Sequence, residues 1–155
     1  MGKSAGQKQL DKQDKGVYLL ILMLNTNQRI IAGKLKQTEF APGIYLYIGS
    51  ARNGLLGRIA RHLRKEKKIF WHIDYFLQRA KIKEIWVRNN YFDECQILNE
   101  AKNTLKNSCF PAKKFGSSDC RCPSHLIYLH ENEANLNSLR KKLSFKKVNI
   151  HGIQA

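Results

Sequence analysis

The chain has 155 residues, 43% of them hydrophobic, and this length and composition suit one domain with an apolar core. Its 28 lysines and arginines against 12 aspartates and glutamates give a net charge of +16, which favours a polyanionic partner, nucleic acid above all. The longest apolar run, residues 17–24, is too short for a membrane span, so we expect no membrane association.

Residues 1–15 are polar and have no apolar core, so we expect a disordered basic leader and neither a signal peptide nor an anchor. This makes the protein intracellular and cytoplasmic, nucleoid-associated if its source is bacterial or archaeal, with reduced cysteines.

Residues 17–24 are apolar at every position, which predicts a central strand with both faces buried. The turn residues 25–27 follow, and residues 29–35 are predicted to be the hairpin partner of that strand. The β-branched and aromatic segment 43–48 predicts a third strand. Side chains alternate along a strand, so Tyr45 and Tyr47 should share one face of the sheet.

A basic helix is predicted directly after this third strand. Its apolar stripe consists of Leu55, Ile59 and Leu63. Arg58 and His62 are four residues apart and therefore share a helix face beside the stripe. Further cations follow at Arg61, Arg64, Lys65, Lys67 and Lys68. The alternative is that Arg58 and His62 are solvated residues of an ordinary amphipathic helix.

Two short motifs carry a family resemblance. Gly16-Val17-Tyr18 and Tyr47-Ile48-Gly49, followed by Arg58 and His62, resemble the GIY-YIG nuclease superfamily. The closest branch occurs alone or fused to an endonuclease III-type DNA glycosylase. In the superfamily the two motifs occupy separate strands of a hairpin. Gly43-Ile44-Tyr45 lies in the same strand as Tyr47 and is therefore not the first motif.

The resemblance extends from about residue 16 to residue 129, and the chain departs from the pattern at three points. An extra strand is predicted between Tyr18 and Tyr47. Ser50 stands where the family often has a lysine, and the family's late asparagine has no evident counterpart.

Two helices and a strand are predicted after the basic helix. Residues 70–77 read as a short buried helix, in which His72 is either a structural histidine, the preferred interpretation, or a group near a phosphate or metal. Residues 83–88 read as a strand near a sheet edge. Residues 93–105 read as a helix with an acidic start, which carries Glu94 beside its apolar stripe and Glu100 on another face.

The resemblance implies the roles of the candidate catalytic residues. Glu94 would hold a single Mg²⁺ or Mn²⁺, with Glu100 as the rival ligand. Arg58 would bind phosphate oxygens as their charge grows. Tyr18 or Tyr47 would orient or activate the attacking water, for which cationic surroundings must lower the phenol pKa. His62 would relay the proton or position the water.

The segment 113–125 is rich in reactive groups. One interpretation is a structural zinc site of Cys120, Cys122 and His125, with Cys95 or Cys109 as the fourth ligand. The other, which the narrow ligand spacing favours, leaves the cysteines buried and without metal, while Ser117, Ser118 and Asp119 cap local amides and line a nucleic-acid groove.

These patterns together predict an α+β fold with a small, mainly antiparallel central sheet flanked by helices. Residues 16–130 form the nuclease-like domain and residues 131–155 a basic C-terminal helix and tail. The expected activity is metal-dependent endonucleolytic hydrolysis, with DNA favoured over RNA, in repair, recombination or defence. The alternatives are a non-catalytic nucleic-acid-binding module and an accessory protein. The candidate nucleic-acid-binding residues are Arg52, Arg61, Arg64, Lys65, Lys68, His72, Ser117 and Ser118.

Overall fold

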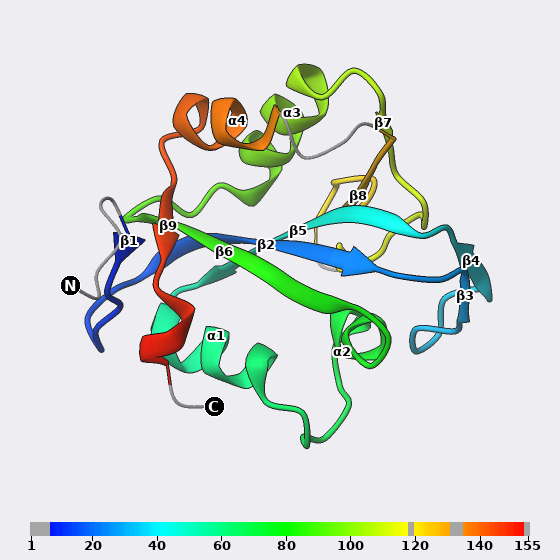
Figure 1. Ribbon diagram of the computed structural model, residues 1–155, viewed down its shortest axis with the longest axis horizontal. Coiled ribbons are helices and arrows are strands. Elements are labelled where there is room, and N and C mark those ends of the chain that lie inside the picture. Colours follow the sequence, from blue (N-terminus) through cyan, green and yellow to red (C-terminus); the bar gives the residue numbers. More distant parts are fainter. Residues whose placement is uncertain (1–6, 118–119, 131–134, 154–155) are drawn as a thin grey trace.

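The computed structural model describes residues 7–117, 120–130 and 135–153, and in this part of the chain it shows an α+β fold (Figure 1). A seven-stranded, mostly antiparallel sheet has the order β1-β9-β6-β2-β5-β8-β7. Its strands are β1 (Gln7–Lys8), β2 (Gly16–Leu24), β5 (Gly43–Ala51), β6 (Lys81–Asn89), β7 (Ser108–Cys109), β8 (Leu126–Leu129) and β9 (Lys146–Val148). The predicted fold class is confirmed.

Two helices cover each face of the sheet. In Figure 1, α1 (Leu55–Leu63) and α2 (His72–Leu77) lie below it, and α3 (Glu94–Thr104) and α4 (Leu136–Lys142) lie above it. Tyr45 and Tyr47 belong to the core on the α1 side, whereas Ile44, Leu46 and Ile48 belong to the core on the α3 side. The predicted alternation along β5 is therefore confirmed, and so are the helices predicted over 55–63, 70–77 and 93–105.

Strand β2 is the centre of the sheet because it is apolar on both faces. Antiparallel pairing aligns it with β5 on one side and with β6 on the other. The two strands that carry the GIY-YIG-like motifs are thus direct neighbours, with Tyr18 opposite Gly49 and Leu20 opposite Tyr47. The long stretch between the motifs does not separate them.

Residues 29–35 are not the partner of β2, contrary to the prediction. Strand β3 (Gln28–Ile30) pairs with β4 (Thr38–Phe40) in a separate two-stranded ribbon. A fully apolar strand gains more from pairing with the apolar β5 than with this short polar segment. Strand β6 pairs with β2 on one side, whereas on its other side the short β9 pairs only with Trp86 and Val87. Among the described residues, most of β6 therefore borders the edge of the sheet, in agreement with the prediction.

The two ends of the chain also differ from their predictions. Within the leader expected over 1–15, Gln7 and Lys8 form β1, which runs parallel to β9, and Asp14 is buried. Residues 1–6 lie outside the described part. Within the expected C-terminal tail, β9 pairs with β6, and the 3-10 turn η2 (Ile150–Gly152) follows. Among the described residues, no helix is long and apolar enough to cross a membrane.

A buried ion pair joins α1 to α2. Asp74 is fully buried and accepts from both terminal nitrogens of Arg61 at 2.8 Å and from the backbone N–H groups of Phe70 and Trp71 at 2.9 Å. Burial acts to raise the pKa of Asp74, but the hydrogen bonds from Arg61 and the two amides prevail and hold the pKa below its ordinary value.

We expect Asp74→Asn to lower the free energy of unfolding by about 3 kcal/mol, because Arg61 loses its charged partner and the two amides lose a charged acceptor. Urea unfolding followed by circular dichroism measures this. The control is Glu39→Gln, which breaks the exposed Arg29–Glu39 pair and should cost less than ~1 kcal/mol. Equal effects of the two substitutions would contradict a structural role for the buried pair.

Candidate active site

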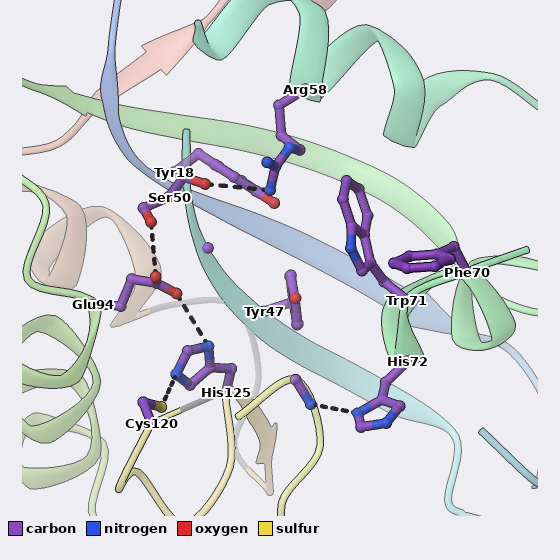
Figure 2. Close-up of a pocket in the computed structure, with 12 residues that line it drawn as sticks. Tyr18, Tyr47, Ser50, Arg58, Phe70, Trp71, His72, Glu94, Cys120 and His125 are labelled. Atoms are coloured by element: carbon purple, nitrogen blue, oxygen red, sulfur yellow. Dashed lines mark hydrogen bonds and ion pairs between the residues drawn. The ribbon is translucent and has the colours of Figure 1, made fainter. Parts of the chain in front are cut away.

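A pocket opens where β5 extends beyond the end of β8. The β5–β8 pairing ends at Tyr47 and Leu126, so the last residues of β5 have a paired strand only on the β2 side. Here groups from both faces of the sheet meet around a cavity of about 450 Å³ (Figure 2). Among the predicted site residues, Tyr18, Tyr47, Arg58, His72 and Glu94 line it. Ser50, Phe70, Trp71, Cys120 and His125 also contribute.

The register of β2 against β5 explains the glycine of the second motif. Tyr18 lies opposite Gly49, and a Cβ atom at Gly49 would lie only 2.5 Å from the Cζ and hydroxyl oxygen of Tyr18. A side chain at position 49 would therefore displace the phenol. Glycine allows the Tyr18 ring to lie across the β5 backbone and face the pocket.

His62 lies behind Tyr18. Its Nε2 is 2.7 Å from the Tyr18 hydroxyl, and the imidazole is only 3% exposed. Burial, reinforced by the charge of Lys67, lowers the pKa of His62 to about 3, so the ring is neutral at neutral pH. Its buried Nδ1 has no hydrogen-bond partner among the described residues. The alternative of a solvated surface histidine is thus excluded.

Tyr47 is held by the loop before β8. Gly116 has a φ of +71°, and a Cβ there would lie 2.9 Å from Cε1 of Tyr47, so glycine is required both by its backbone conformation and by the close approach. Burial raises the pKa of Tyr18 and of Tyr47, and the opposing charge of Arg58 does not reverse this. Arg58 alone therefore does not supply the lowered phenol pKa that the sequence expectation requires of Arg58 and the metal together, and both phenols are neutral.

Arg58 is the cation of the pocket. Its guanidinium lies over the Trp71 ring at 4.4 Å from the centroid, and its Nη1 donates to the Ser50 carbonyl at 3.3 Å. A guanidinium has five N–H donors, so most of them remain available to an anion. The partly buried position of Arg58 beside the apolar stripe of α1 agrees with the sequence prediction.

Glu94 begins α3 and reaches the pocket around the end of β5. Its Oε1 accepts from the Ser50 hydroxyl at 2.7 Å, and its Oε2 lies 3.2 Å from Nδ1 of His125. Burial acts to raise the pKa of Glu94, but the bonds from His125 and Ser50 and the charge of Arg58 lower it below its ordinary value. Glu94 is therefore a carboxylate at neutral pH.

Glu100, the rival metal ligand, lies elsewhere on α3. It accepts from the Gln96 side chain at 3.4 Å and does not line the pocket. Of the described residues that line the pocket, Glu94 alone carries a carboxylate.

The predicted nucleic-acid-binding residues differ in their exposure and in their contacts. The exposed cations are Arg52, Arg64, Lys65 and Lys68. His72 lines the pocket and accepts from the Gly116 N–H through Nδ1 at 2.9 Å, as expected of a hydrogen-bonded structural histidine. Burial lowers its pKa.

Arg61 and Ser117 do not fit their predicted roles. Arg61 is engaged by Asp74 and lies over Trp71, at 4.2 Å from the ring centroid, so its role in this structure is structural. Ser117 is 1% exposed and cannot line a groove. The partner of Arg61, Asp74, lies 13 residues farther along the chain, so local charge did not reveal it. The buried Ser117 hydroxyl caps no amide, because it has no hydrogen-bond partner among the described residues. Ser118 and Asp119 lie outside the described residues.

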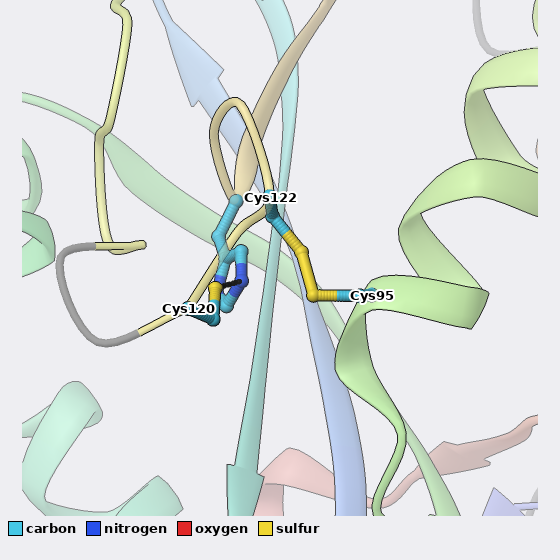
Figure 3. Close-up of side chains that lie close together, drawn as sticks. Cys95, Cys120 and Cys122 are labelled. Atoms are coloured by element: carbon cyan, nitrogen blue, oxygen red, sulfur yellow. Dashed lines mark hydrogen bonds between the residues drawn. A yellow bond between two sulfur atoms is a disulfide. The ribbon is translucent and has the colours of Figure 1, made fainter.

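A cysteine and histidine cluster adjoins the pocket. The ligand atoms of Cys95, Cys120, Cys122 and His125 all lie within 4.8 Å of one another, so this group can hold a metal such as zinc. Cys109 in β7 is not part of it. Figure 3 shows the Cys95 and Cys122 sulfurs joined as a disulfide, whereas the sequence predicts reduced cysteines.

Sequence reasoning did not assign Ser50, Phe70 and Trp71 to the site. Ser50 directly follows the second motif, and its position there was the available signal. An aromatic pair next to a basic helix was the signal for Phe70 and Trp71, since arginines stack on such rings.

Comparison with known proteins links the chain to a family of proteins. The family model described as "Domain of unknown function DUF123" matches residues 17–148. No curated protein and no solved structure matches the chain. The matched region contains every residue of the pocket.

The buried neutral His62 predicts a pH-dependent stability. The unfolded chain takes up a proton at His62 near pH 6.5, but the folded chain only near pH 3, so the free energy of unfolding falls as the pH is lowered through this window. The slope from this group reaches at most ~1.4 kcal/mol per pH unit. We expect His62→Gln to flatten the dependence above about pH 4.5, where most carboxylates are already ionised.

Urea unfolding at a series of pH values measures this slope. The burial of His72 adds a contribution of the same sign, which is common to wild type and variant. Substitution of the exposed His130 by glutamine is the control and should leave the slope unchanged. An unchanged slope in the His62→Gln protein would contradict the buried, neutral state of this residue.

Proposed function

The chain belongs to the DUF123 family, and we propose that it is a metal-dependent endonuclease of the GIY-YIG type that hydrolyses phosphodiester bonds, in DNA in preference to RNA. One observation carries the proposal. Tyr18, Tyr47, Arg58 and Glu94 come from four different elements and line a single pocket, with His62 bonded to Tyr18 behind it. These are the residue types and the order that the motif resemblance implies.

Phosphodiester hydrolysis needs a phosphate clamp, and Arg58 is suited to it. The guanidinium is oriented by Trp71 and Ser50, and its five N–H donors exceed the one that the Ser50 carbonyl uses. It would donate to the non-bridging oxygens, whose negative charge grows in the transition state. A planar, always charged group does this without a change of protonation.

The neutral phenol and imidazole suggest a proton path. In the His62 tautomer with the proton on Nδ1, Nε2 accepts from the Tyr18 hydroxyl. The attacking water would then give its proton to the Tyr18 oxygen as Tyr18 passes its own to His62. An anionic phosphodiester in the pocket favours the charged imidazolium and so supports the transfer. Tyr47 would orient the water from the adjacent position on β5.

The pocket is compatible with one Mg²⁺ or Mn²⁺. Hard cations prefer oxygen ligands, and Mg²⁺ often uses one or two carboxylates together with water and substrate phosphate. Glu94 is ionised, and each of its oxygens has a lone pair beyond those used by Ser50 and His125. When bound, such an ion would neutralise charge on the phosphate and the leaving oxygen.

The surroundings of the pocket support a nucleic-acid substrate. Phe70 lines the pocket and is 71% exposed, which offers a ring on which a base can stack. Exposed cations such as Arg64 and Lys65 continue along the chain from α1. In a chain of net charge +16 these would attract the backbone phosphates of a polynucleotide.

The proposal predicts that Glu94→Gln abolishes cleavage and leaves nucleic-acid binding nearly unchanged, because the metal loses its carboxylate while the cationic surface remains. Labelled linear, flapped and branched DNA, and RNA, are incubated with Mg²⁺, Mn²⁺ or EDTA, and binding is measured in parallel. Glu100→Gln, on the same helix but outside the pocket, is the matched control and should cleave normally.

Two results would count against this proposal. Normal cleavage by Glu94→Gln with loss in Glu100→Gln would move the metal ligand to Glu100. Tight, salt-sensitive binding without products on any substrate would establish instead the non-catalytic nucleic-acid-binding module.

Arg58→Ala should lower the cleavage rate by at least ~100-fold, the scale on which a transition-state charge clamp is lost. Single-turnover kinetics at saturating enzyme separates this effect from weaker binding. Arg79→Ala removes the same charge from an exposed position outside the pocket. If both variants lost rate equally, the effect of Arg58 would be one of overall charge and not of position.

A further inference from the structure

We infer that Cys95, Cys120, Cys122 and His125 form a structural zinc site in the reduced chain, and that the zinc-bound His125 positions Glu94. This goes beyond the proposed nuclease activity and does not depend on it. The site joins the first turn of α3 to the loop that precedes β8 (Figure 3).

The first argument is geometric. A tetrahedral zinc ion with Zn–S bonds of about 2.3 Å places its ligand atoms roughly 3.8 Å apart. The four ligand atoms already lie within 4.8 Å of one another, so small side-chain rotations would suffice. The spacing of Cys120, Cys122 and His125 alone is a weak signal. Cys95, from a distant part of the sequence, completes the set of four.

The second argument is the orientation of His125. Its Nδ1 faces Glu94 Oε2 at 3.2 Å, whereas its Nε2 faces Cys120 Sγ at 3.3 Å. With the proton on Nδ1, the Nε2 lone pair points to the sulfur cluster and is free to bind a metal. Metal-binding histidines commonly donate their other N–H to a carboxylate in this way, and the carboxylate fixes the tautomer.

The backbone holds His125 firmly in place. Its N–H donates to the Phe115 carbonyl at 2.7 Å, and its carbonyl accepts from the Ile48 N–H at 3.0 Å. The imidazole itself is 4% exposed. The Cys120 N–H donates to the Ser117 carbonyl at 3.3 Å, so the backbone at Cys120 is also held in position.

The ligand set makes this ion structural. Four protein ligands close the coordination sphere of zinc and leave no position for a reactive water. This ion therefore differs from the Mg²⁺ or Mn²⁺ proposed for the pocket. Three thiolates and a neutral imidazole give the bound site a charge of about −1, which a strongly cationic chain accommodates.

The disulfide and the zinc site exclude each other, because Cys95 and Cys122 supply both. A phosphine reductant and one water molecule convert the disulfide to two thiols: the water supplies both thiol protons, and its oxygen is transferred to the phosphine, which becomes the phosphine oxide. Zinc then displaces the thiol protons as it binds. The disulfide shows that the backbone of α3 and of the segment before β8 brings the Cys95 and Cys122 sulfurs together.

The zinc site would set the geometry of the pocket from outside. It would hold His125, which bonds to Glu94, in one position. It would also restrict the movement of Gly116, which lies against Tyr47. His125 is therefore a positioning residue, since it acts on Glu94 and lines the pocket without a proposed role in proton transfer.

The test uses the full chain, reduced with a phosphine and loaded with zinc. We expect one zinc per chain by elemental analysis after gel filtration, and a tetrahedral thiolate spectrum when Co²⁺ replaces zinc. Cys120→Ser should weaken zinc binding by at least ~10-fold in a competition titration with a chromophoric chelator. Cys109→Ser, which removes a cysteine outside the cluster, should bind zinc as wild type does.

The positioning role has its own readout. Glu94→Gln should weaken zinc binding by about 10-fold to 100-fold through His125. His125→Cys keeps four ligands but cannot donate to Glu94, so in that background Glu94→Gln should leave zinc affinity unchanged. This double-mutant cycle requires no nuclease activity, and a failed zinc proposal is thereby distinguished from a failed nuclease proposal.

Three outcomes would overturn the inference. A reduced chain that is folded by circular dichroism but retains no zinc would refute the site. Undiminished zinc affinity in Cys120→Ser would refute the ligand set. An equal effect of Glu94→Gln in the wild-type and His125→Cys backgrounds would refute the positioning role.

Discussion

The close approach of Tyr18 to Gly49 across the β2–β5 pair is the constraint on which the pocket depends. It fixes the register in which Leu20 faces Tyr47, so both phenols lie on the α1 side of the sheet. A slip of one residue would move every side chain of β2 to the opposite face. The apolar character of β2 on both faces keeps the strand in the middle of the sheet, and the absence of a Cβ at Gly49 leaves room for the Tyr18 ring.

The short length of β8 has an equally large effect. Because β8 pairs with β5 only as far as Tyr47, no further strand of the described part of the chain covers the end of β5 on that side, and residues from opposite layers can meet there. Ser50 faces α3 and donates to Glu94, while its backbone carbonyl accepts from Arg58 of α1. One residue thus links an anion from one layer to a cation from the other.

Local pattern predicted the elements of this fold well and the contacts between distant segments poorly. The alternation of Tyr45 and Tyr47 with Ile44 and Leu46, and the helical stripe of α1, follow from spacing alone and are confirmed. The pairing of β2 was mispredicted because turn residues favour a local hairpin, whereas the apolar partner lies farther along the chain. Strand β1 was not predicted, because its two residues are too few to show the alternation of apolar and polar side chains that marks a strand. The motif resemblance placed Tyr18, Tyr47, Arg58 and Glu94 in one site, but the partners Ser50 and His125 required the structure.

The charges that would attract a nucleic acid differ in position from the groups that would act on its phosphate. Most of the +16 lies on exposed lysines and arginines, whereas the described residues of the pocket include a guanidinium, a carboxylate and two phenols that burial keeps neutral. A polynucleotide would therefore be drawn to the surface by many screened, interchangeable charges. In the proposed reaction, the scissile phosphate would meet few groups, each oriented by a specific partner: Arg58 by Trp71, Tyr18 by His62 and Glu94 by His125. Loss of one surface cation would then remove a small part of the total attraction, whereas loss of one orienting partner would disturb a group that acts at a defined position in the pocket.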